Sequence, residues 1–264
     1  MKPSEIDKFL DVALEAALAS SDIIMNSLDL PKLKNYKGPA DLVTKTDHHS
    51  ERVIKTIISS NFPKHSILAE ESGQDINNSD YLWIIDPLDG TTNFYHGYPS
   101  FSVSIALYHL NKPVLGIVLE MPNLKMYSGI VGKGAFCEGK AIQCSKTEFL
   151  DESLLITGFA YKHDEIWAKN MELFKYFTSA THGVRRLGAA SIDICHVASG
   201  KADGYWEFRL KPWDTAAAII IAKEAGAIIS QVNGEEYNIY ENNILVANPK
   251  IYDQMKKTII SYSN

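Results

Sequence analysis

The sequence has few cysteines and no long apolar run. Its three cysteines, Cys137, Cys144 and Cys195, are spread over 264 residues and show no Cys-x-x-Cys spacing. A sparse, odd set of thiols is typical of reduced cytoplasmic proteins rather than of disulfide frameworks or zinc sites. No segment approaches the ~20 apolar residues that a membrane-spanning helix needs, and the first residues lack the apolar stretch of a signal peptide. We therefore expect a cytoplasmic protein with no membrane partner.

The sequence also lacks an excess of basic residues. Lysine and arginine total 26 against 32 aspartates and glutamates, which gives a net charge of −6. A general nucleic-acid-binding protein would normally carry a basic face, so we expect no nucleic-acid partner. An anionic small molecule remains a possible substrate, because bound metal ions can reverse the potential of an acidic cleft.

Several common catalytic motifs are missing. No Gly-x-Ser-x-Gly element indicates a serine hydrolase, and the histidines have no zinc-type spacing. The segment 134–140 imitates a phosphate-binding P-loop, but Ala141 follows it in place of Ser or Thr, and strand-like segments surround it. We interpret this segment as a hairpin turn.

Apolar periodicity predicts a layered α/β (α+β) fold with mixed, largely antiparallel sheets. Helices are expected near residues 4–28, 48–60, 189–199, 215–225 and 250–261. Strands are expected near 66–70, 81–86, 100–109, 114–121, 126–130, 135–137, 154–158, 204–208, 228–230 and 244–247. Turn signals at 111–112 and 122–123 indicate antiparallel hairpins, and 31–41 should form a loop or short arm. We expect one domain over 1–264, with subdomains at about 1–148 and 149–264.

The segment 83–94 contains the clearest chemical signal. An apolar strand reaches Asp86, and Pro87 is expected to force a turn that brings Asp89 back beside it. Two carboxylates and the carbonyl of Leu88 would suit a hard cation such as Mg²⁺. The following 90–92 segment could begin a helical turn whose N–H groups receive a phosphate. Taken alone, the segment is equally well explained as a plain Pro-x-Asp-Gly turn.

Three further acidic positions have ordinary explanations when each is taken alone. Glu70 and Glu71 close a predicted strand and could form a solvated acidic loop. Asp47 and Asp214 each precede a predicted helix, where an N-cap aspartate is common. An N-cap carboxylate can also bind a metal through its second oxygen, so the two roles are compatible.

Taken together, the segments 41–47, 70–72, 86–94 and 213–214 resemble the inositol monophosphatase family of lithium-sensitive, magnesium-dependent phosphatases. The blocks stand in the family's order, and the likeness extends from about residue 41 to 234. The resemblance implies an αβαβα sandwich, a phosphoric monoester hydrolase, a homodimer and inhibition by lithium. It also implies two or three Mg²⁺ per site and a water nucleophile without a covalent phosphoenzyme.

The resemblance assigns roles to particular residues. It implies that the metal ligands are Glu70, Asp86, the carbonyl of Leu88, Asp89 and Asp214. It implies that the water is oriented and activated by Asp47, Glu70 and Thr91. It implies that the substrate is bound by Gly90, Thr91, Thr92, Gly188, Ala189, Glu207 and Asp214.

The same resemblance narrows the substrate, a small phosphorylated polyol or sugar. Relatives that act on histidinol phosphate or phosphoadenosine phosphate typically have lysine where this chain has Thr92. This favours an inositol phosphate, most specifically myo-inositol 1-phosphate, with Glu207 accepting hydrogen bonds from its hydroxyls. Lys211 stands where animal members have histidine, and Arg209 and Ala218 replace glycines, so these positions could alter the substrate range.

The sequence is also compatible with other hypotheses. Glu207 could be an ordinary acid at the end of a strand. Fructose-1,6-bisphosphatase, or another sugar or histidinol phosphatase of the superfamily, is the nearest enzymatic alternative. A protein that acts mainly through regulatory binding is a further alternative of a different class.

Overall fold

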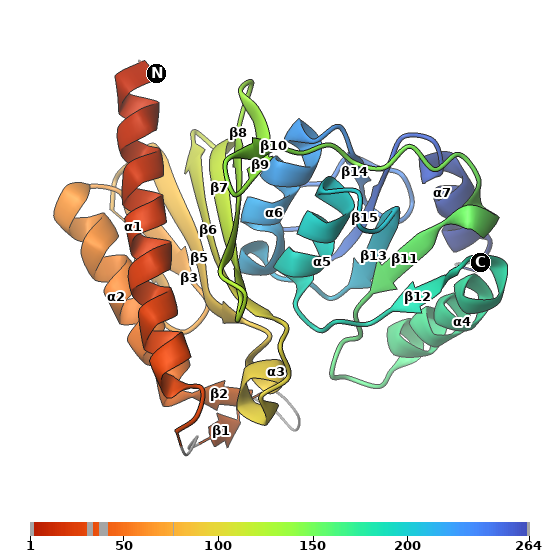
Figure 1. Cartoon of the computed structure of the whole chain (residues 1–264), viewed down its shortest axis with the longest axis horizontal. Coiled ribbons are helices and arrows are strands. Elements are labelled where there is room, and N and C mark those ends of the chain that lie inside the picture. The colour runs from red at the N-terminus through yellow and green to blue at the C-terminus, as the bar shows by residue number, and fades with distance from the viewer. Residues whose placement is uncertain (1–2, 31–33, 37–41, 76, 263–264) are drawn as a thin grey trace.

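The chain folds into alternating layers of helices and sheets, seen edge-on in Figure 1. The computed structural model describes residues 3–30, 34–36, 42–75 and 77–262. Three layers of helices alternate with two sheets. The outer layer beside the first sheet consists of α1 (Pro3–Ser27) and α2 (Lys45–Asn61), and the middle layer consists of α5 (Ala190–Ala198) and α6 (Pro212–Glu224). The outer layer beside the second sheet consists of α4 (Glu165–Ala180) and α7 (Tyr252–Ser261). The predicted αβαβα sandwich is confirmed.

The first sheet has eight strands in the order β10-β9-β8-β7-β6-β5-β3-β4. Their bounds are β3 Ser66–Ala69, β4 Gly73–Asp75, β5 Tyr81–Asp89, β6 Phe101–His109, β7 Lys112–Met121, β8 Lys125–Ile130, β9 Gly134–Cys137 and β10 Lys140–Ala141. β3 and β5 are parallel, whereas the other pairs are antiparallel. The β6–β7, β7–β8 and β9–β10 hairpins confirm the predicted turns, including the hairpin at the P-loop-like segment.

The second sheet has five strands in the order β12-β11-β13-β15-β14 and is also mixed. Their bounds are β11 Leu154–Thr157, β12 Gly183–Arg185, β13 Gly204–Phe208, β14 Ile228–Ser230 and β15 Asn243–Ala247. A separate antiparallel pair is formed by β1 (Lys34–Tyr36) and β2 (Leu42–Thr44). The rest of the expected 31–41 arm lies outside the described residues.

Strand β5 is a nearly continuous apolar run because both of its faces are buried. Trp83 and Ile85 pack against α1 and α2, whereas Ile84 packs against the middle helices. Alternate side chains of a strand point to opposite faces, so both faces must be apolar at this position in the sheet. This burial fixes the strand whose end carries Asp86 and Asp89.

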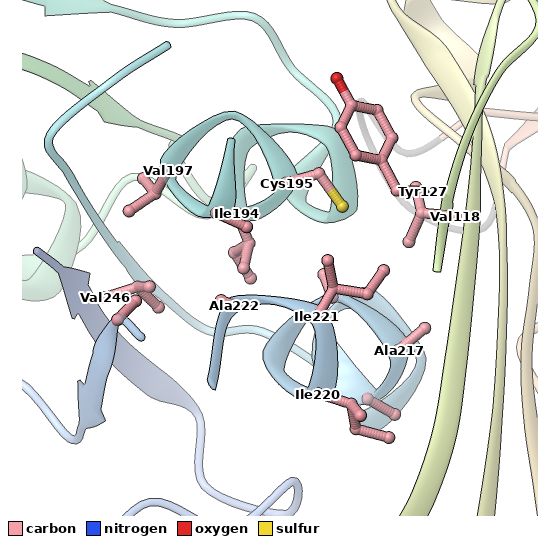
Figure 2. Close-up of a cluster of buried hydrophobic side chains, with 14 of the residues drawn as sticks. Val118, Tyr127, Ile194, Cys195, Val197, Ala217, Ile220, Ile221, Ala222 and Val246 are labelled. Atoms are coloured by element: carbon pink, nitrogen blue, oxygen red, sulfur yellow. The ribbon is translucent and has the colours of Figure 1, made fainter. Parts of the chain in front are cut away.

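Helix α6 packs directly onto the backbone of the first sheet. A Cβ at Gly116 of β7 would collide with the carbonyl oxygen of Ala217, so only glycine permits this approach. Figure 2 shows Ile221 of α6 in the cluster between Val118 of the first sheet and Val246 of the second. This packing sets the position of the α6 N-terminus, where Asp214 is located.

Two helix starts differ from the sequence predictions. α2 begins at Lys45, because Thr44 is its N-cap and Asp47 is the third helical residue of a capping box. α6 begins at Pro212 after the N-cap Lys211, and Asp214 again occupies the third position. Neither aspartate is therefore an N-cap, although both accept a backbone N–H at a helix start.

Several elements were not predicted. The long helix α4 has a mixed aromatic and polar sequence, and Asp164 caps it through the backbone N–H groups of Ile166 and Trp167. The short helix α3 (Thr91–His96) extends the helical turn expected at 90–92. Strands β4, β10 and β12 and a single 3₁₀ turn at Leu150–Glu152 are also additions. Among the described residues, no helix combines the length and apolarity that crossing a membrane requires.

Candidate active site

Asp86 and Asp89 lie on one strand, not on either side of a turn. β5 continues through Asp89, and its pairing with β6 shifts from Asp86–Ser104 to Asp89–Ser102. Three residues on β5 thus span two on β6, which is a β-bulge. Because Ser104 and Ser102 are two apart, their partners Asp86 and Asp89 face the same side of the sheet. The bulge therefore replaces the predicted turn and places the two carboxylates together.

A pocket of about 500 Å³ opens at the end of this strand. It is lined by every predicted metal-binding and substrate-binding residue: Glu70, Asp86, Leu88, Asp89, Gly90, Thr91, Thr92, Gly188, Ala189, Glu207 and Asp214. These residues lie just after β3, on β5, at and before the start of α3, just before α5, on β13 and at the start of α6. The structure thus brings together, in one cavity, residues that are up to 144 positions apart (214 − 70 = 144).

Asp89 is held in place by Ser191, a contact that the sequence did not predict. The backbone N–H of Ser191 donates to Asp89 Oδ2 at 2.8 Å, and its hydroxyl contacts the same oxygen at 2.6 Å. Burial raises the pKa of Asp89 to about 6, against the lowering effect of these hydrogen bonds and together with the charge of Glu70. The signal for Ser191 was its place in the segment 188–191, which resembles the segment that lines the substrate pocket in the family.

The acids around the pocket repel one another. Burial raises the pKa of Asp86 well above its usual range, and the charges of Glu70, Asp89 and Asp214 raise it further. Burial likewise raises the pKa of Asp214, although the N–H of Lys211 donates to its Oδ2 at 2.6 Å. Packing several carboxylates into one desolvated site is unfavourable unless a cation compensates their charge.

The donor set fits magnesium. Within the described part of the chain, no three His, Cys, Asp or Glu side chains form a group that could hold a metal ion by themselves. Mg²⁺ seldom uses such an all-protein cage, because it binds through one or two carboxylates, waters and substrate phosphate. The carboxylates of Glu70, Asp86, Asp89 and Asp214 and the carbonyl of Leu88 are hard oxygen ligands of this kind.

Asp47 lies behind the pocket wall and reaches it through Thr91. Its Oδ1 accepts from the Thr91 hydroxyl at 2.8 Å, and its Oδ2 accepts from the N–H of Thr44 at 2.9 Å. Burial raises the pKa of Asp47, while the hydrogen bonds from Thr44 and Thr91 lower it. The Thr91 oxygen is also 3.0 Å from the carbonyl of Leu88, but its single proton can serve only one acceptor.

A second residue that sequence reasoning missed joins two walls of the pocket. The side-chain amide of Asn93 donates to the carbonyls of Ser100 and Leu187, each at 2.7 Å. These bonds connect α3 to the segment that leads into Gly188. Asn93 follows Thr92 directly in sequence, but nothing in the sequence indicated that its partner lies 94 residues away.

Glu207 lines the same pocket from strand β13. Its Oε2 accepts from the buried hydroxyl of Tyr205 at 2.5 Å. Burial raises the pKa of Glu207 to about 7; the Tyr205 hydrogen bond lowers it, Asp89 raises it, and Arg186 lowers it. Glu207 is therefore a half-buried acceptor that lines the cavity, not an exposed acid at the end of a strand.

An αβαβα sandwich with such an acidic pocket between its sheets is the fold of a class of phosphoric monoester hydrolases. The family model described as inositol monophosphatase family matches residues 5–263. The chain is 45% identical over 257 residues to phosphatase IMPL1 of Arabidopsis thaliana, covering 95% of this chain and 69% of the relative. It is 41% identical over 260 residues to inositol-1-monophosphatase of Synechocystis sp., covering 97% and 90%.

Comparison with solved structures agrees with the sequence comparisons. The extragenic suppressor protein suhB of Bartonella henselae matches with a TM-score of 0.92 and 31% identity, over 96% of this chain and 98% of that one. The chain belongs to the inositol monophosphatase family. It is by class a phosphoric monoester hydrolase, and this family is generally dependent on Mg²⁺.

Proposed function

We propose that the protein hydrolyses myo-inositol 1-phosphate to inositol and inorganic phosphate with the help of Mg²⁺. One observation carries this proposal: the acidic cluster and Glu207 line the same 500 Å³ pocket. The cluster suits a phosphate with its metal ions, and Glu207 suits the hydroxyls of a polyol. The similarity to inositol-1-monophosphatase of Synechocystis sp. supports the same substrate.

The metal would be held by Glu70, Asp86, Asp89, Asp214 and the carbonyl of Leu88. When bound, Mg²⁺ offsets the charge of the phosphate and lowers the pKa of a water. The backbone N–H groups of Gly90 and Thr91 would bind the phosphate. No covalent phosphoenzyme is expected, because water is the nucleophile.

Thr91 and Asp47 form the proposed pair that positions the attacking water. The single Thr91 proton points to Asp47 Oδ1, which lies at 2.8 Å and is nearer than the Leu88 carbonyl at 3.0 Å. The Thr91 oxygen is then free to accept a hydrogen bond from the attacking water. Glu70 orients the same water and takes up its proton, in the manner of a general base.

The alcohol side of the pocket would recognise the leaving group. Glu207 accepts hydrogen bonds from the polyol hydroxyls, while Thr92, Gly188 and Ala189 line the space around the ring. Ionised Glu207 is the stronger acceptor, because charge-assisted hydrogen bonds are stronger than neutral ones.

The direct test is phosphate release from a panel of esters by the purified protein. We expect turnover of myo-inositol 1-phosphate with Mg²⁺ and none with excess chelator. Fructose 1,6-bisphosphate, histidinol phosphate and adenosine bisphosphate should be poorer substrates. Faster release from any of these would replace the proposed substrate. Release from no ester would favour a protein that acts mainly by binding.

The proposal also covers the setting of the enzyme. Homodimers are implied by the family resemblance, and light scattering of the purified protein measures the mass directly. A cytoplasmic location and the absence of a nucleic-acid partner are supported by the sparse cysteines and the net charge of −6. Salt-dependent binding of the protein to duplex DNA or RNA would contradict the latter expectation.

A further inference from the structure

We propose that Arg209 determines specificity by clamping one wall of the pocket, an inference that rests on the proposed function. The wall is the 158–164 segment, which connects β11 to α4 and lines the pocket through residues 158–162. Arg209 stands on the facing connection between β13 and α6, which lines the pocket as well.

The backbone of Arg209 adopts an unfavourable conformation. Its φ is +67°, in the left-handed region that side-chain-bearing residues rarely adopt. Its N–H and that of Leu210, at 3.2 Å, both donate to the carbonyl of Asn242, which fixes the conformation. A glycine would take up this conformation without strain. An arginine there is maintained only if its side chain makes a compensating interaction.

That interaction is an ion pair with Asp164. The guanidinium of Arg209 contacts Asp164 Oδ2, while Asp164 Oδ1 accepts the N–H groups of Ile166 and Trp167 at 3.1 and 3.3 Å. The two charged side chains are only 33% and 23% exposed. One carboxylate oxygen of Asp164 therefore caps the start of α4, and the other binds the guanidinium of Arg209.

The clamped segment lines the pocket between α4 and α3. Phe159 packs against Trp167 and Phe174 of α4, which anchors the segment on one side. On the other side, the hydroxyl of Tyr161 lies 3.5 Å from the hydroxyl of Thr92 on α3. The segment thus extends from α4 to α3 along one wall of the pocket.

The position of this segment also limits the space around Glu207. A Cβ at Gly158 would overlap the Glu207 carboxylate, so the segment lies directly against the proposed polyol acceptor. Displacement of the segment would enlarge the alcohol side of the pocket without moving Asp86 or Asp89. The clamp therefore restricts the enzyme to compact polyol monophosphates and excludes bulkier esters, such as nucleoside monophosphates.

The test compares Asp164→Asn, Arg209→Gly and the double variant. Asparagine can still cap α4 but cannot form the ion pair. For myo-inositol 1-phosphate, each single variant should raise KM about fivefold, the effect of one partly shielded charge pair, with kcat nearly unchanged. The ratio of kcat/KM between this substrate and adenosine 2′-monophosphate should fall. The double variant should match Asp164→Asn, because Asp164→Asn already removes the Arg209 ion pair together with the weaker contact of Asp164 to Lys162 at 3.8 Å.

Asp253→Asn is the matched control, because it removes the exposed Lys256–Asp253 ion pair on the distant helix α7 and should change neither ratio nor KM. Hydrogen exchange provides a readout independent of activity: amides of 159–163 should exchange faster in both clamp variants, while those of Ile166 and Trp167 stay protected in Asp164→Asn. Unchanged exchange, or an equal loss of kcat/KM for both esters, overturns the clamp. A wild-type protein that hydrolyses no ester overturns the proposed function, and exchange alone then decides the clamp.

Discussion

At the scale of single residues, Asp89 offers a direct test of the proposed metal site. It lies on the bulge, faces Asp86 and is fixed by Ser191. Asp89→Asn keeps the shape but removes the charge, so kcat/KM at ordinary Mg²⁺ should fall by at least about 100-fold. A Mg²⁺ titration of turnover measures the effect, and an unchanged circular dichroism spectrum excludes misfolding. Near-normal turnover would remove Asp89 from the ligand set.

Thr91 offers a second test, because a conservative variant is available. Thr91→Val removes the hydroxyl that contacts Asp47 while keeping the shape of the side chain. We expect kcat to fall about 100-fold or more, as for the loss of a proton-transfer group, with a smaller change in KM. Thr91→Ser retains the hydroxyl and should recover most of the activity. Equal losses in both variants would indicate a packing role instead.

Glu207 should control affinity for the polyol more than the rate of hydrolysis. Its pKa of about 7 means that the ionised, stronger acceptor becomes dominant as the pH rises through that value. KM for myo-inositol 1-phosphate should therefore decrease between about pH 6 and 8. Glu207→Gln should raise KM about tenfold, as for a lost charged hydrogen bond, and flatten this pH profile. A uniform loss of activity across unrelated esters would point to a structural role.

At the scale of elements, the contact between α6 and β7 links packing to chemistry. Gly116→Ala would push α6 away from the sheet and displace Asp214, so unfolding should become easier by about 1–3 kcal/mol and kcat should fall. Ile117→Val is the control, because Ile117 packs on the other face, against the α1–α2 layer. It should cost about 1 kcal/mol but leave kcat unchanged. Chemical denaturation and steady-state kinetics measure both effects.

The elements also show what the sequence could and could not predict. Long periodic helices and the hairpins were predictable, because burial imposes a period of 3.6 or 2 on their residues. The bulge was not, because an inserted residue leaves no signature in the apolar run that precedes Asp86. The predicted starts of the helices at 48 and 215 were three residues too late. The N-cap residues are Thr44 and Lys211, and Asp47 and Asp214 lie in the first turns of α2 and α6.

The site itself was predicted only where its residues cluster in motifs. Each metal-ligand candidate belongs to a short block whose order matches the family. Ser191 and Asn93 act through partners far away in sequence, so no local pattern reveals these contacts. Arg209 stood out as a replaced glycine, but its partner Asp164 was not predicted. The division into subdomains at about residue 148 remains a prediction, although the first sheet ends at Ala141 and the second begins at Leu154.

At the scale of the whole molecule, stability should depend on pH through the acidic pocket. Burial raises the pKa of Asp89 to about 6, whereas an unfolded aspartate titrates near about 4. The folded state thus binds this proton more tightly, so its stabilising contribution is complete below about pH 4 and is lost as the pH rises through 6. The melting temperatures of the wild type and of Asp89→Asn should be measured in the presence of a chelator. The wild-type value minus the Asp89→Asn value should decrease as the pH rises from about 4 to 6.

Added Mg²⁺ should reverse this trend. A cation that binds the ionised acids stabilises only the folded state, so the melting temperature should rise with Mg²⁺, and more at pH 7 than at pH 4.5. Differential scanning calorimetry at the two pH values measures the effect. A melting temperature that does not respond to Mg²⁺ at pH 7 would argue against metal binding by these residues.

The bulge in β5 has a consequence for how the site tolerates mutation. The proposed ligand between the two aspartates is the carbonyl of Leu88, while the Leu88 side chain is buried in the layer beneath α1 and α2. Every amino acid has a backbone carbonyl oxygen, so a substitution at this position can change the core packing while the proposed ligand is kept. Only an insertion or deletion that alters the register would remove it. This ligand is therefore inherited with the strand pairing itself and not with any particular amino acid.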